Sequence, residues 1–174
     1  MPSRRRFLGT VGTCLPLAIA GCLHSPERVE GYVQFKLIDG LVTEPGRTTT
    51  VPIVHVDASY ENDAPPDLVA LHEEWANRFP VPRMPTVSDS LHEALAEQFD
   101  SVRYVVGTTS PGWAEGDESV GSFNVVTTRE NFNRVQVHTK VTASSDGTSL
   151  TIHSVDGVWD FDGTGRDDAA RGSN

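Results

Sequence analysis

The sequence has little lysine and no long apolar run. Lys36 and Lys140 are the only lysines among 14 basic residues, against 24 Asp and Glu, and the formal charge is −10. Affinity for nucleic acid comes mainly from Lys and Arg that neutralise phosphates, so this composition argues against a nucleic-acid partner. No run of about 18 consecutive apolar residues occurs, which argues against a permanent transmembrane helix.

Cysteine is scarce as well. Both cysteines, Cys14 and Cys22, lie near the N-terminus. The chain from residue 23 onward therefore has no disulfide, no Cys-ligated metal and no thiol nucleophile. What remains is an ordinary composition, with 174 residues, 37% apolar and 22% charged. That length predicts one domain large enough for a hydrophobic core.

The first 22 residues have the layout of an export signal. A basic start is followed by a short apolar stretch over residues 9–20 and by small residues before Cys22. Ser3 to Leu8 resembles the twin-arginine (Tat) export motif S-R-R-x-F-L, with Arg4, Arg5, Phe7 and Leu8 at its main positions, although Gly9 replaces the usual lysine. Residues 19–22, Ile-Ala-Gly-Cys, are similar to a lipobox.

The resemblance is to Tat-exported lipoproteins of the haloarchaeal type, and it covers residues 3–22 only. It implies removal of residues 1–21 and a lipid on Cys22. Two lipid chains would hold the protein stably on the extracellular face of the cell membrane. An ordinary signal that is cleaved elsewhere is the alternative.

The acidic surplus fits a halophilic origin. Loss of Arg4, Arg5 and Arg6 with the signal changes the formal charge from −10 to −13. In molar salt the screening length falls to about 3 Å, so repulsion between carboxylates is tolerated. An acidic exported protein of a non-halophile is the alternative.

The remaining chain predicts an α+β domain over residues 31–162, between a lipidated tether (22–30) and a disordered acidic tail (163–174). Alternating or β-branched stretches predict an antiparallel sheet of about five to six strands. Apolar spacing predicts two helices, over 63–79 and 88–99, that pack on one face of this sheet. The predicted strands are 32–37, 49–56, 102–106, 122–127, 134–143, 149–155 and a seventh candidate at 158–161.

Two of these segments give more detail. In the first strand, Val33, Phe35 and Leu37 are predicted to share the buried face. The pair Asp146-Gly147 predicts a two-residue hairpin turn, with Val141 opposite Ile152, Ala143 opposite Leu150 and Lys140 opposite His153.

The histidines do not form a known metal motif. His72-Glu73 and His92-Glu93 each begin like H-E-x-x-H, but Ala76 and Ala96 stand where the second histidine belongs. His72 is expected to border the inner face of its helix. His138 and His153 are expected to lie diagonally across the outer face of the hairpin, within reach of one ion, or else to be plain surface residues.

The segment 160–168 resembles Asp/Gly-rich calcium loops, with Asp160, Asp162 and Asp168 as the ligands. It departs from them at Thr164 and has no closing Glu, so a solvated acidic tail is the alternative. No other cofactor is predicted.

Catalytic motifs are incomplete. Ser119 lacks the first glycine of G-x-S-x-G. Trp113 lies in an acidic, Gly-containing loop and either contacts a partner or, as the favoured interpretation, packs on the core. The sequence thus favours a non-enzymatic, membrane-anchored binding or envelope-associated module. The alternatives are an exported hydrolase whose carboxylates (Glu73, Glu74, Glu93) converge in space, and a calcium-stabilised structural module.

Overall fold

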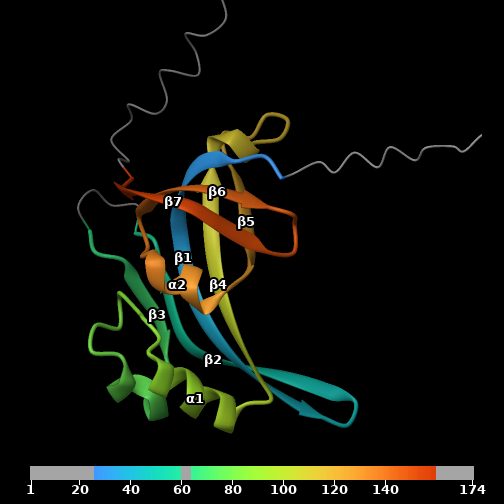
Figure 1. The fold of residues 1–174 in the computed structure, drawn as a ribbon, viewed down its shortest axis with the longest axis vertical. Coiled ribbons are helices and arrows are strands. Elements are labelled where there is room, and N and C mark those ends of the chain that lie inside the picture. The colour runs from blue at the N-terminus through green and yellow to red at the C-terminus, as the bar shows by residue number, and fades with distance from the viewer. Residues whose placement is uncertain (1–25, 60–63, 160–174) are drawn as a thin grey trace, which may run out of the picture.

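Seven strands form one mostly antiparallel sheet in the computed structural model, which describes residues 26–59 and 64–159 (Figure 1). The predicted α+β class is confirmed, with seven strands in place of five to six. In chain order the elements are β1 (Val29–Glu44), β2 (Arg47–Asp57), β3 (Asp67–Leu71), the 3₁₀ helix η1 (Glu73–Arg78), α1 (Asp89–Gln98), β4 (Ser101–Ser110), the 3₁₀ helix η2 (Pro111–Trp113), β5 (Gly121–Thr127), α2 (Arg129–Arg134), β6 (Thr139–Ser145) and β7 (Leu150–Val158).

Strand β1, with 16 residues, organises the sheet. One of its edges pairs first with β6, over residues 29–32, and then with β2, over residues 35–44. Its other edge pairs with β4. The order is therefore β7-β6-β1-β4-β5 at one end and β3-β2-β1-β4-β5 at the other. A parallel bridge between Val126 and Ser149 brings β5 toward the start of β7, so the first end curls.

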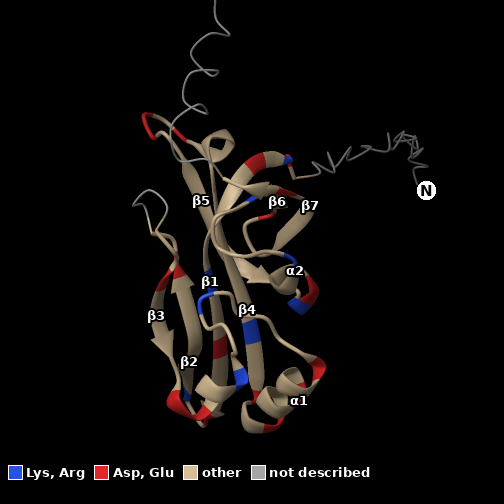
Figure 2. Cartoon of the chain, turned by 90° about the vertical axis from the view of Figure 1, so that its left-hand side faces the viewer, with Lys and Arg blue, Asp and Glu red and all other residues tan. Residues whose placement is uncertain are grey.

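Helices α1 and α2 and the β6–β7 hairpin lie on the same side of β1 and β4 (Figure 2). Helix α1 begins where the sequence predicts, because the Ser88 hydroxyl accepts a hydrogen bond from the Leu91 N–H as its N-cap. Leu91 and Leu95 are buried against the sheet. Gly40 of β1 leaves room for the Phe99 ring, since a Cβ there would lie 2.4 Å from a ring carbon.

The predicted buried face of β1 is correct for Val33 but wrong for Phe35 and Leu37, which are half-buried on the other face. Val33, Lys36 and Ile38 are each 0% exposed. A register shift against β4 between Val33 and Phe35 breaks the strict alternation. The residue that the pattern places toward solvent, Lys36, is therefore in the interior.

The predicted helix over 63–79 is also wrong. Its middle is strand β3, followed by the short η1, and residues 60–63 lie outside the described part of the chain. Leu68 pairs with Val56 and Leu71 with Val54, with a register shift between them that adds Val69 to the edge strand. This bulge puts residues three apart on one face, which imitates helical spacing.

The β6–β7 hairpin exists, but its predicted register is wrong. Val141 pairs with Val155, Ala143 with Ile152 and Ser145 with Leu150. The connection therefore spans residues 146–149 rather than two residues. The Asp146 carboxylate accepts hydrogen bonds from the backbone N–H groups of Thr148 and Ser149 and from both hydroxyls, which stabilises the longer loop and holds the pKa of Asp146 well below its usual range. Lys140 pairs with Tyr32 of β1, not with His153.

The strand predicted over 134–143 begins later than expected. Residues 129–134 form helix α2, and β6 begins only at Thr139. At the N-terminal side the sheet starts at Val29, two residues before the predicted domain boundary. Among residues 26–59 and 64–159, no helix is both long and apolar enough to span a lipid bilayer.

Candidate functional site

Several predicted site residues lie outside the described part of the chain. These are the export-motif and lipidation residues and the calcium-loop residues: Arg4, Arg5, Phe7, Leu8, Cys22, Asp160, Asp162 and Asp168. Their roles stay predictions from the sequence.

The three candidate carboxylates are not gathered into a catalytic cluster within the described residues. Glu73 and Glu74 are exposed on η1, and Glu93 is exposed on α1. Within the two described ranges, no group of three or more His, Cys, Asp or Glu side chains is arranged to hold a metal ion. Ser119 is exposed in the loop before β5.

The histidines have structural surroundings instead. His153 Nε2 lies 2.8 Å from the Ser144 hydroxyl, and burial, followed by the charge of Arg28, lowers the pKa of His153. His138 precedes β6 with a φ of 70°, so the predicted diagonal pair across the hairpin is wrong. His72, predicted to border the inner face of a helix, is half-buried in the link between β3 and η1 instead. The His92 Nδ1 atom lies 2.7 Å from the Tyr104 hydroxyl.

Trp113 follows the favoured interpretation. Its ring packs edge-on against Phe123, with centroids 4.9 Å apart, and contacts the hydrophobic core. It is therefore part of the packing around η2 and β5 rather than a free contact residue.

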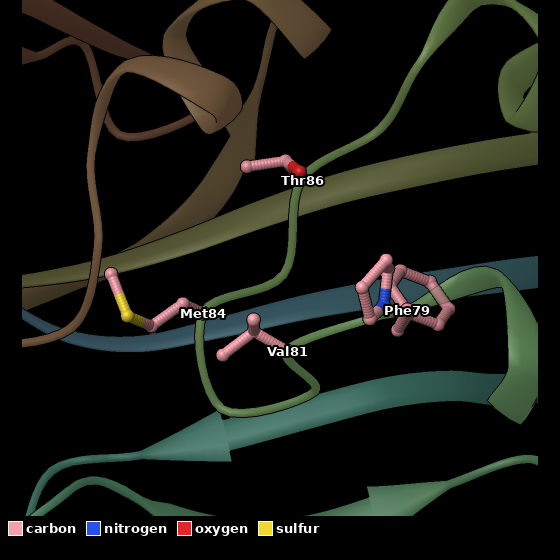
Figure 3. Close-up of a pocket in the computed structure, with 5 residues that line it drawn as sticks. Phe79, Val81, Met84 and Thr86 are labelled. Atoms are coloured by element: carbon pink, nitrogen blue, oxygen red, sulfur yellow. The ribbon is translucent and has the colours of Figure 1, made fainter.

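The described residues do form an apolar pocket, in the segment between η1 and α1. It has a volume of about 120 Å³ and is lined by Phe79, Pro80, Val81, Met84 and Thr86 (Figure 3). Phe79 is buried, whereas Val81 is 55% and Met84 53% exposed. An apolar hollow whose rim side chains are open to solvent is the kind of surface that receives an apolar group from a partner.

Local sequence explains the shape of this segment. Prolines at 80, 82 and 85 fix φ and remove backbone donors, so no helix can continue from η1. The Met84 N–H donates to the Val81 carbonyl at 2.9 Å and closes a turn that brings the two rim residues together.

A buried lysine holds the far side of the same segment. The Lys36 ammonium donates to the carbonyls of Pro85 and Val135, both at 2.7 Å, and to Gln136 Oε1 at 3.1 Å. The three acceptors match the three N–H donors of a charged lysine. The Nζ atom also lies 4.0 Å from the centre of the Phe132 ring. Lys36 thereby connects Pro85, which lies between the pocket residues Met84 and Thr86, to residues 135 and 136 after α2.

A second polar contact fixes the next residues. The Asn133 side chain accepts from the Val87 N–H at 2.8 Å and donates to the Val87 carbonyl at 2.9 Å. Arg129 forms an ion pair with Asp89 at 2.6 Å. The pocket segment is therefore attached to β1 and α2 from residue 85 to residue 89, so the pocket is built before any partner arrives.

Two ionisable groups near this segment are perturbed by their surroundings. Burial lowers the pKa of Lys36 to about 7. Burial raises the pKa of Tyr104, and Arg129 opposes that shift. Neither Lys36 nor Tyr104 is open to solvent, with exposed fractions of 0% and 6%. Both side chains contact the Phe132 ring and so stabilise the packing of α2 in the core.

Comparison with known proteins adds no assignment. No family model matches the chain, and neither a curated protein nor a solved structure is significantly similar to it.

Proposed function

We propose that this protein is a lipid-anchored, non-enzymatic binding module on the extracellular face of a cell membrane, and that its pocket accepts one apolar side chain of a partner protein. The anchor is inferred from the lipobox around Cys22 and the twin-arginine motif. The acidic composition supports a halophilic archaeal source. The observation that carries the binding role is the pocket with its exposed rim, Val81 and Met84.

The size of the pocket decides between classes of ligand. Sites for drug-sized molecules and cofactors have volumes of roughly 300–1,000 Å³. A volume of about 120 Å³ is well below that range. Apolar cavities of about 150 Å³ hold a molecule the size of benzene. The pocket therefore suits one aliphatic or small aromatic side chain, which is how a protein partner inserts an anchor residue.

Methionine labelling tests the pocket directly. Met1 and Met84 are the only methionines, and Met1 belongs to the predicted signal. In protein labelled with [methyl-¹³C]methionine, N-acetyl-leucinamide should shift the Met84 signal with a dissociation constant on the order of millimolar. N-acetyl-serinamide should leave the signal unchanged.

Val81→Ser should weaken this binding, because it removes apolar surface from the rim. Val69→Ser is the matched control, since Val69 on β3 is 56% exposed and lies outside the pocket. Equal effects of leucinamide and serinamide, or of the two variants, would contradict the proposed binding site.

The anchor has a separate test. Wild-type protein expressed in an archaeal host should fractionate with membranes and carry a lipid at Cys22, detected by mass spectrometry. Cys22→Ser should release the protein into the soluble or medium fraction, because the acyl chains would be lost. A bare Cys22 thiol in wild-type protein would rule out the proposed anchor.

A further inference from the structure

We propose that the partner of the pocket is an acidic peptide segment that inserts one aliphatic side chain while its carboxylates contact Arg78 and Arg83. This inference rests on the proposed binding function and adds the chemistry of the partner.

The charge of the pocket segment differs in sign from that of the whole chain. The chain has 24 acidic residues against 14 basic ones. The segment from Trp75 to Ser88 nevertheless contains two arginines and no Asp or Glu. This segment itself therefore carries a charge of +2, although Glu73 and Glu74 precede it and Asp89, which is paired with Arg129, follows it. The pocket lies within this segment. An acidic partner is therefore attracted to the pocket and repelled by most of the remaining surface.

The two arginines of this segment lie next to the pocket in sequence. Arg78 directly precedes Phe79, and Arg83 directly precedes Met84, so both adjoin residues that line the pocket. Arg78 Nη2 donates to the Ser90 carbonyl at 3.2 Å, and Arg83 Nη1 donates to the Pro66 carbonyl. Each guanidinium is thus held through one of its nitrogens. Its other N–H groups can donate hydrogen bonds to a carboxylate.

No carboxylate among residues 26–59 and 64–159 neutralises these two charges. Both side chains are exposed. In the described ranges, carboxylates pair with Arg103, Arg129 and Lys140 but not with Arg78 or Arg83. The combination of one small apolar pocket and two exposed guanidinium groups fits a peptide with Asp or Glu on either side of a Leu, Ile or Met.

A peptide-display experiment tests this chemistry without a known partner. A random 12-residue library is panned on the wild-type protein, and enriched peptides are measured against variants. We expect enrichment of sequences with several acidic residues around one aliphatic residue. Arg78→Gln combined with Arg83→Gln should weaken their binding about tenfold, as for two partly exposed ion pairs. Arg47→Gln, at an exposed arginine that begins β2, should leave it unchanged.

The outcomes separate the inference from the function. Peptides whose binding depends on Val81 but which have no acidic bias, or which tolerate the double arginine variant, overturn the inference and leave the binding function intact. A library with no Val81-dependent peptide overturns both. Broadening of the Met84 methyl signal by phosphatidylglycerol vesicles, with no such peptide found, also overturns both and assigns the patch to an anionic membrane surface.

Discussion

At the scale of single residues, Lys36 is the feature with the largest energetic consequence. Its amine is fully buried, and its partners are two backbone carbonyls, a side-chain amide oxygen and an aromatic ring. None of these partners carries a negative charge. The hydrogen bonds favour the ammonium, but desolvation opposes it and lowers the pKa of Lys36 to about 7.

The lowered pKa predicts how stability changes with pH. Between pH 7 and the unfolded value of 10.5, the unfolded chain binds more protons at Lys36 than the folded protein does. The free energy of unfolding should therefore rise as the pH increases from 7 to 9. Lys36→Met removes the titrating group, so its stability should change little over this interval. Urea unfolding of both proteins at pH 7, 8 and 9 measures the difference.

Other perturbed groups do not imitate this effect. The lowered pKa of His153 places its titration below the interval, and the raised pKa of Tyr104 places that titration above it. Parallel pH profiles for wild type and Lys36→Met would show that the buried amine does not titrate there. At any of these pH values the variant should also lose about 1–3 kcal/mol for each carbonyl left without a donor, partly offset by the absence of a buried charge.

Lys36 also marks what sequence can predict at this scale. The alternation of Val33, Phe35 and Leu37 correctly indicates a strand, yet it gives the wrong face for Phe35 and Leu37. One register shift, which depends on how β4 pairs, moves the lysine inward. The sequence offers two signals for the pocket and its support: the scarcity of lysine and the prolines after Phe79. Neither signal reveals that Lys36 contacts Pro85.

At the scale of elements, apolar spacing predicts a helix reliably only where a local cap supports it. Ser88 and the Leu91–Leu95 pattern correctly give α1, because the cap and the buried face are properties of the helix itself. Leu68 and Leu71 mislead, since their shared face arises from a bulge against β2. The sequence correctly predicts a hairpin between β6 and β7. Its loop is longer than predicted, because Asp146 accepts hydrogen bonds from Thr148 and Ser149, and the register of the two strands changes accordingly.

The contact between β1 and the end of α1 gives a second prediction. Gly40→Ala places a methyl group where the Phe99 ring lies, at 2.4 Å from its nearest carbon. We expect a loss of about 1–3 kcal/mol in the free energy of unfolding, as for other overpacked cores. Phe99→Leu in the same chain should recover part of that loss, although Phe99→Leu alone destabilises. Additive effects in this double-mutant cycle would contradict the contact.

At the scale of the whole molecule, charge is the dominant property. The net charge of −10 creates repulsion that the folded state concentrates in a smaller volume. Potassium chloride screens this repulsion, and the screening length falls from about 10 Å at 0.1 M to about 3 Å at 1 M. We therefore expect the midpoint of thermal unfolding to rise between 0.1 and 2 M KCl.

An exposed-charge control isolates the cause. Substituting several exposed acidic residues, such as Glu44, Glu73 and Glu97, by glutamine should flatten the dependence on salt, because less repulsion remains to be screened. A midpoint that is insensitive to KCl in the wild-type protein would count against the halophilic origin inferred from composition.

The pairing of β1 has a mechanical consequence for any force applied at Val29, where the sheet begins. From Val29 to Tyr32 this strand is bonded to β6 on one edge, and from Tyr32 onward to β4 on the other. A pull along the strand axis loads these ladders in shear, so many bonds must break together instead of opening one after another. The domain is thus fastened at its first sheet residue against a pull along β1 from that end.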